Sequence, residues 1–212
     1  MEHSAPPNLL KLALLLTCLA VIVSGIRPYD FGTWLLEALP VILVIPILIM
    51  TYRKFPLTPL LYLGIFLHAL VLLLGAKYSY ARVPLGFEIA DWLSLERNPY
   101  DKIGHFFQGL VPAIAAREIL IRHHSVVGNV MRSFIIICIV LAISATYELI
   151  EWGAALALGQ GAVEFLGTQG DPWDTQSDMF CALLGVITAL LLFSNMHQRQ
   201  INAITIQKNN QH

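Results

Sequence analysis

Residues 134–158 read FIIICIVLAISATYELIEWGAALAL, and this stretch determines the class of protein to which the chain belongs. It is long enough to cross a bilayer, because a transmembrane helix needs about 20 predominantly apolar residues. Glu148 and Glu151 nevertheless lie within it, three residues apart and therefore on one face of a helix. Because a charge at mid-bilayer costs about 2.5–3.5 kcal/mol, acids in a span are functional by default. The stretch predicts a membrane-spanning helix that carries part of a site.

The whole chain has the composition of an integral membrane protein. Of its 212 residues, 57% are hydrophobic and 13% are charged, and the mean hydropathy is +0.67, whereas soluble domains carry about 25% charged residues. The net charge of −1 and the absence of a basic run exclude nucleic acid as a partner. Cys18, Cys138 and Cys181 all lie in apolar stretches, which argues against disulfides and thiolate metal sites. We expect one integral membrane domain over residues 1–212, in contact with the lipid bilayer.

Six apolar runs predict an all-α polytopic bundle of about six transmembrane helices. The predicted spans are Leu9–Ile26, Thr33–Met50, Pro59–Ala76, Ile103–Ile121, Phe134–Leu158 and Met179–Met196. We keep the first run as a span instead of a cleaved signal peptide, because no small-residue cleavage site stands cleanly before Arg27.

The connection between the third and fourth spans, Lys77–Tyr100, mixes apolar and acidic residues and predicts a short amphipathic helix on the membrane surface. Cytoplasmic loops carry an excess of Lys and Arg. With the amino terminus in the cytoplasm, eight such residues lie inside and five outside. The outer loop Gly159–Ser177 has none. Both termini are therefore expected in the cytoplasm.

The fourth and sixth spans begin with one repeated pattern. Residues 98–105 read NPYDKIGH and residues 171–178 read DPWDTQSD. The first residue of each suits the N-cap and the proline suits the first helical position. Asp101 and Asp174 then fall at the third position, where a carboxylate favours the positive end of the helix. Capping alone explains these two aspartates, and ligation or proton transfer is the alternative.

Two residues of the pattern lie one turn deeper than any cap. His105 and Asp178 each follow their aspartate by four residues and share its helical face. In the predicted topology, both helices enter from the outer side, where Glu148 and Glu151 also lie. Six groups can therefore meet just below the outer surface: Asp101, His105, Glu148, Glu151, Asp174 and Asp178.

Few positive charges are available to neutralise these groups. Lys102 and Arg97 are the cations at that level, so protons or a metal ion must supply the missing charge. Carboxylate and imidazole donors without Cys or Met fit zinc, manganese, iron or magnesium better than copper(I). We expect the metal ligands to be Asp101, His105, Glu148 and Asp178, and the catalytic groups to be Glu148, Glu151 and Asp174.

Two other polar residues in the spans are not among the expected site residues. Glu37, near the outer end of the second span, either joins the site or reaches the interface. His68, alone in the apolar third span, is expected to be a packing residue.

Three segments carry a resemblance to a known family. Residues 97–109, 147–152 and 166–179 resemble those of the YjdF-like family of bacterial inner-membrane proteins. They are more distantly similar to VanZ-like membrane proteins, which also carry an Asp-Lys-x-x-His opening on a span. The resemblance covers most of the chain and implies a multi-pass protein of the bacterial inner membrane. It implies no activity and no cofactor.

Two classes of function, and a third without chemistry, fit these observations. In the first, a divalent metal activates water in a hydrolase or transferase that acts on a lipid or envelope precursor. In the second, the same acids bind protons or a cation in a coupled transporter. A non-catalytic accessory membrane protein is the third. Below the site, the fourth and sixth spans offer mainly Gln108, Cys181 and Thr188, and this one-sidedness favours the enzyme.

Overall fold

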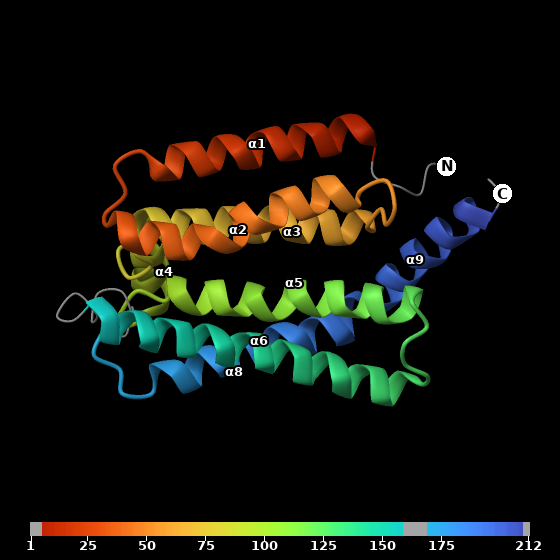
Figure 1. Ribbon diagram of the computed structural model, residues 1–212. Helices are drawn as coiled ribbons and strands as arrows, with labels where there is room; N and C mark the ends of the chain where they lie inside the picture. Colours follow the sequence, from red (N-terminus) through yellow and green to blue (C-terminus); the bar gives the residue numbers. More distant parts are fainter. Residues whose placement is uncertain (1–5, 159–168, 210–212) are drawn as a thin grey trace.

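The computed structural model describes residues 6–158 and 169–209, and the regular structure within these ranges is helical throughout (Figure 1). The helices are α1 (Pro7–Gly25), α2 (Phe31–Thr51), α3 (Pro59–Tyr78), α4 (Pro84–Leu93), α5 (Tyr100–Arg122), α6 (Asn129–Leu158), α8 (Asp174–Thr188), the π-helical segment η2 (Ala189–Phe193) and α9 (Ser194–Asn209). The prediction of an all-α bundle with a short helix between the third and fourth spans is confirmed.

The predicted spans correspond to long helices. Among the described residues, five helical segments are long and apolar enough to cross a membrane: Pro7–Gly25, Phe31–Thr51, Pro59–Tyr78, Asn129–Ala157 and Asp174–Ile206. The last is longer than predicted, because α8 continues through η2 into α9 without a break. The predicted fourth span corresponds to α5, whose 23 residues are long enough but more polar.

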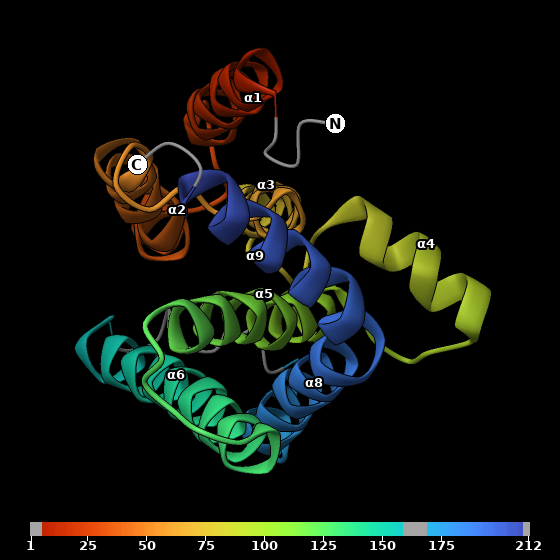
Figure 2. The ribbon, with the colours of Figure 1, turned by 90° about the vertical axis from the view of Figure 1, so that its right-hand side faces the viewer.

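The central position of α5 explains why it tolerates polar residues. Figure 2 shows α1, α2 and α3 on one side of α5, and α6 and α8 on the other. α5 packs against α3, α6 and α8, so its polar side chains face protein instead of lipid. Large apolar side chains elsewhere face outward, as those of Leu43 and Ile47 do, and in a bilayer these contact hydrocarbon.

Local sequence signals set the helix ends. Thr58 caps α3, where its side chain accepts the amide hydrogen of Leu61 and Pro59 takes the first position. Asp30 caps α2 by accepting the amide hydrogen of Thr33 at 2.7 Å. In α4, Trp92 is 91% exposed, which suits a helix lying at the membrane interface.

α5 and α8 approach closely through glycine. A Cβ atom built on Gly109 would lie 1.9 Å from the carbonyl oxygen of Ala182, and one built on Gly185 would lie 2.1 Å from that of Phe106. Such approach through small residues is typical of membrane helix pairs. It brings the beginnings of the two helices, which carry the repeated pattern, side by side.

The start of α1 and the end of α9 lie at one end of the bundle, opposite α4 (Figure 1). This arrangement agrees with an even number of crossings. Of the predicted outer loop, residues 159–168 lie outside the described residues.

Candidate metal centre

The two site-bearing helices begin slightly later than the pattern predicts. Their N-cap positions are Pro99 and Trp173, so the prediction that Asn98 and Asp171 occupy them is wrong. Pro99 has φ −88° and ψ 10°, outside the helical region, and the helix therefore starts after it. The side chains of the two predicted caps still accept backbone hydrogen bonds. Asn98 accepts from the amide of Tyr100 at 3.0 Å, and Asp171 accepts from the amide of Trp173 at 2.9 Å. The aspartates of the pattern remain in the first turn of each helix, at its positive end.

His105 lies where three helices meet. Its Nε2 atom is 3.6 Å from Asp101 Oδ1, 3.8 Å from Glu148 Oε1 and 3.9 Å from Asp178 Oδ2. His105, Glu148 and Asp178 are buried, and Asp101 is mostly so. The structure thus brings together the four side chains expected as metal ligands, from α5, α6 and α8.

The other imidazole nitrogen of His105 is already engaged. Its Nδ1 lies 3.0 Å from Gln108 Oε1, a carbonyl oxygen that can only accept a hydrogen bond, so Nδ1 carries the proton. Nε2 then presents either a lone pair or a second proton to the three carboxylates. A lone pair that faces three carboxylates requires either a metal ion between them or a proton on one of the carboxyl groups. A hydrogen bond on the far nitrogen is also how metal-binding histidines are oriented.

Glu148 has a buried oxygen without a partner. Its Oε1, the atom nearest His105, makes no hydrogen bond within the described part of the chain. Leaving a buried carboxylate oxygen unpaired costs several kcal/mol, so this atom calls for a donor or a metal. One ligand atom each from Asp101, His105 and Asp178 lies within 4.8 Å of the others. A metal with bonds of about 2.0–2.2 Å holds ligands at most about 4.4 Å apart, so closure by a few tenths of an ångström would complete the site.

Lys102 holds the neighbouring acids. Its Nζ donates to Asp174 Oδ1 at 2.8 Å, to Asp178 Oδ1 at 2.7 Å and to Ser177 Oγ at 2.7 Å. Asp178 therefore binds the ammonium through Oδ1 and turns Oδ2 toward His105. Asp174, expected as a catalytic residue, pairs with cations and does not join the group around His105.

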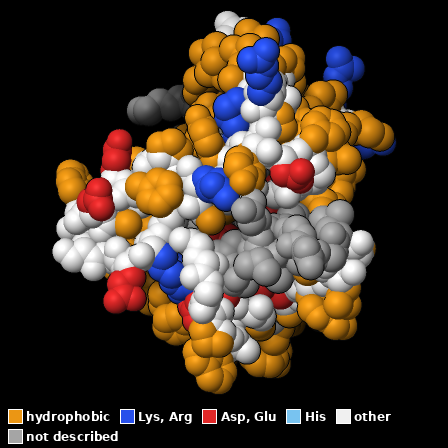
Figure 3. All heavy atoms as spheres, turned by 90° about the vertical axis from the view of Figure 1, so that its left-hand side faces the viewer, with side chains coloured by type: hydrophobic (Ala, Val, Ile, Leu, Met, Phe, Trp, Pro, Cys, Tyr) orange, Lys and Arg blue, Asp and Glu red, His pale blue; other side chains and the backbone are white. Residues whose placement is uncertain are grey.

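Arg97 extends this ion network outward. It pairs with Asp171, and its Nη1 lies 3.5 Å from Asp174 Oδ1. The amide of Trp173, with the Arg97 guanidinium, holds the pKa of Asp171 below its ordinary value. Figure 3 shows Lys and Arg side chains among Asp and Glu at this end of the bundle. The outer rim is therefore neutralised by side chains, and of the three acids around His105, Asp178 shares this neutralisation through Lys102.

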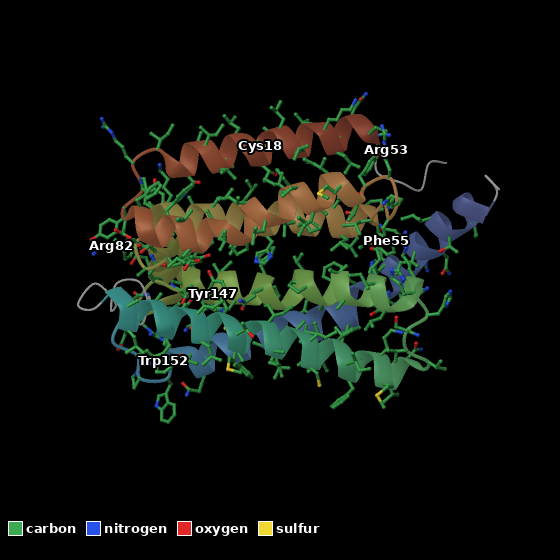
Figure 4. All side chains as sticks on the ribbon, viewed as in Figure 1. Cys18, Arg53, Phe55, Arg82, Tyr147 and Trp152 are labelled. Carbon is green, nitrogen blue, oxygen red and sulfur yellow. The ribbon has the colours of Figure 1, made fainter. Side chains whose placement is uncertain are left out.

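Two further acids, Glu37 and Glu151, border the centre. Tyr147, which projects from α6 (Figure 4), donates to Glu37 Oε2 of α2 at 2.6 Å, and its ring meets that of His105 edge-on. Glu37 thus joins the surroundings of the site and does not reach the interface. Glu151 is buried and lines the same cavity as Glu37 and Tyr147.

A cavity of about 640 Å³ opens beside the centre. Asp101, His105 and Glu151 line its polar end, and it continues along α2 and α5 between apolar side chains. His68 also lines it, and its Nε2 has no hydrogen-bond partner among the described residues. The imidazole of His68 packs beside the ring of Phe107, at 6.1 Å between centroids.

A polar cluster at the opposite end of the bundle escaped the sequence analysis. Glu118, which is fully buried, accepts hydrogen bonds from the amide and hydroxyl of Thr58 and from Arg122, and lies 3.1 Å from Nε2 of His197. The signal was available, since Glu118 is an acid inside a predicted span. Because its oxygens have several donors, this cluster joins α3, α5 and α9 without requiring a metal.

Comparison with known proteins finds a family and a relative that are similar to this chain. The family described as "Predicted membrane protein (DUF2238)" matches residues 9–199. The chain is similar to "Inner membrane protein YjdF" of Escherichia coli (strain K12), with 57% identity over 201 residues, covering 95% of this chain and 96% of the relative. No solved structure matches the chain.

Proposed function

The chain belongs to this family of multi-pass inner-membrane proteins, and on that premise we propose that it is a metal-dependent hydrolase or transferase. Its substrate is an ester or phosphoester of a membrane lipid or envelope precursor. Under the predicted topology, the reaction takes place at the outer face of the membrane. The metal is a divalent zinc, manganese, iron or magnesium ion.

One observation carries this proposal. The Nε2 atom of His105 faces carboxylate oxygens of Asp101, Glu148 and Asp178 at 3.6–3.9 Å, while its Nδ1 is engaged by Gln108. Lys102 is committed to the other oxygen of Asp178 and to Asp174. The positive charge that this geometry demands is a metal ion, with the imidazolium proton as the competing explanation.

The residues around the centre divide the chemistry. The bound ion would polarise the ester or phosphoryl oxygen of the substrate and make a water molecule more acidic. Glu148 accepts a proton from that water while the water oxygen forms a bond to the carbonyl carbon or the phosphorus of the substrate. The ester C–O or P–O bond breaks, and the departing oxygen takes a proton, which Glu151 supplies as a further carboxyl group that lines the cavity. Asp174 holds Lys102 in position.

Coupled transport receives less support from the same helix. Between Gln108 and Arg117, α5 reads GLVPAIAA, a stretch without an ionisable side chain. At 1.5 Å per residue, about 12 Å of this helix offers no carrier for a proton or cation. This separation of the site from the opposite end of the bundle supports a reaction at one face.

Metal analysis of the protein purified in mild detergent tests the proposal. We expect a stoichiometric divalent metal in the wild type and its loss in His105→Gln and Asp178→Asn. His68→Gln is the matched control, because it changes another histidine of a span that lies outside the group of ligands. If all four proteins contain the same trace background, the charge at His105 is a proton and the metal proposal is wrong.

A further inference from the structure

The cavity beside the metal centre points to the class of substrate. Resting on the proposed function, we propose that it holds a hydrocarbon chain of an outer-leaflet glycerophospholipid, whose ester- or phosphate-bearing end lies against Asp101 and His105. The same cavity of about 640 Å³ is lined by these two residues at one end and by apolar side chains of α1, α2, α3 and α5 beyond them.

The lining changes character with depth. Next to the centre it includes Glu37, Tyr147 and Gln108, which can donate or accept hydrogen bonds to a polar head. Deeper, most of the lining is apolar and includes Val44, Ile45, Leu48, Ile65, Phe66, Val111 and Ala115. The polar side chains of this part are those of Lys11, Thr17, Tyr52, Tyr62 and His68. A lipid has the same division between a polar end and a hydrocarbon chain.

The cavity is deeper than the hydrocarbon part of one leaflet. Asp101 and Ala115 both line it and lie fourteen residues apart on α5, which corresponds to about 21 Å of helix. Half of the hydrocarbon core of a bilayer is about 15 Å. A chain entering from the outer end can therefore leave its leaflet completely and lie inside the protein.

Water or ions do not suit the deep part of this cavity. A buried water needs two to four polar partners. Nε2 of His68 offers one such partner, and the aliphatic side chains around Val44 and Val111 add none. Hydrocarbon needs no such partners, and its contacts with these walls are favourable. The lipid chain is thus the occupant that both ends of the cavity accept.

Photo-crosslinking of the wild-type protein tests this inference directly. The full chain is reconstituted in vesicles of phosphatidylethanolamine and phosphatidylglycerol that include a phospholipid with a diazirine at the end of its acyl chain. We expect crosslinks at Val44, Leu48 and Ala115, inside the cavity. Crosslinks confined to outward-facing positions such as Leu43, which is 53% exposed and does not line the cavity, would overturn the inference.

A pair of adjacent substitutions provides the matched control. Val44→Trp fills the deep cavity and should lower crosslinking at Ala115 on the order of tenfold, because the ring occupies the volume that the chain needs. Leu43 faces lipid, so Leu43→Trp should leave the crosslinking at Ala115 unchanged. If Val44→Trp folds and leaves Ala115 crosslinking at the wild-type level, the inference is wrong. Metal content reports separately on the proposed function, since neither substitution touches a ligand. If the wild-type protein holds its metal but gives no crosslinks inside the cavity, only the lipid chain is refuted.

Discussion

Replacing Gly109 with alanine should separate the two helices that carry the metal centre. The new Cβ would lie 1.9 Å from the carbonyl oxygen of Ala182 and 2.7 Å from its carbonyl carbon. Ordinary contact begins at 3.4 Å, so α8 must move by about 1.5 Å. Both partners are backbone atoms, and no side-chain rotation can relieve the clash. The helices themselves must therefore move apart.

The expected loss of stability follows from two opposing effects. Overpacking a close contact costs about 1–3 kcal/mol, and the upper end applies where backbone meets backbone. Alanine recovers up to about 1 kcal/mol, because it favours a helix more than glycine does. The net loss is about 2 kcal/mol, which corresponds to a Tm lower by about 4–8 °C for a chain of this length.

The same displacement should weaken the metal centre. His105 precedes Gly109 by one helical turn, and Asp178 precedes Ala182 by one turn. The distance of 3.9 Å between His105 Nε2 and Asp178 Oδ2 would rise above the span of about 4.4 Å that one metal ion can bridge. We therefore expect Gly109→Ala to lose bound metal together with stability.

Gly153→Ala on α6 is the matched control, because a Cβ there meets nothing within 4 Å. It should keep the metal and leave Tm unchanged or slightly higher. The assay is thermal unfolding in detergent with metal content measured on the same samples. If Gly109→Ala unfolds at the temperature of Gly153→Ala and retains its metal, the close approach of α5 and α8 is not as described.

Other predictions concern charge, capping and topology. Lys102→Met should lower stability by about 3 kcal/mol, because it removes the ammonium from the buried carboxylates of Asp174 and Asp178 and leaves Asp174 with Arg97 at 3.5 Å. A second change, Asp178→Asn, should recover part of the loss, and an unchanged Tm of Lys102→Met would contradict the prediction. Glu118→Gln should cost about 3–5 kcal/mol in chemical unfolding, since it leaves the buried guanidinium of Arg122 uncompensated. Metal content should stay at the wild-type level. The hydrogen bond from the Thr33 amide holds the pKa of Asp30 below its ordinary value. The stabilisation from this cap is therefore complete above the ordinary pKa of an aspartate and is lost as the pH falls through the lowered pKa. Asp30→Ala should cost about 1 kcal/mol at neutral pH and nothing in acid, and a cost independent of pH would refute the assignment. Thr175→Cys, with the native cysteines replaced, should react with an impermeant thiol reagent in intact cells, and labelling only after permeabilisation would reverse the topology.

Sequence alone was sufficient for the membrane architecture. The apolar runs marked the long helices, and the mixed connection between Lys77 and Tyr100 marked the short surface helix α4. Helical periodicity also placed His105 on the face of Asp101, and their side chains do meet. These inferences succeed because bilayer thickness and helix geometry act on contiguous residues, so the information is local.

The tertiary structure decided which of the polar residues meet. Lys102 pairs with Asp174 and Asp178, more than seventy residues away, and only the close approach of α5 and α8 through Gly109 and Gly185 brings them together. Sequence reasoning grouped Asp174 with the acids around His105, whereas the structure pairs it with cations. Such choices depend on how helices cross, and that is set by packing between residues remote in the chain, which no local pattern encodes.

The cluster around Glu118 and the apolar cavity depend on tertiary structure in the same way. The acid was visible in its span, but its donors come from the start of α3 and from α9. The cavity wall combines residues of five helices, none of which is unusual in its own segment. Hydropathy identifies which helices are apolar enough to cross a membrane, because burial of apolar surface in lipid is a property of one segment. Where a space or a charge network forms is a property of several segments at once, and the packed structure alone determines it.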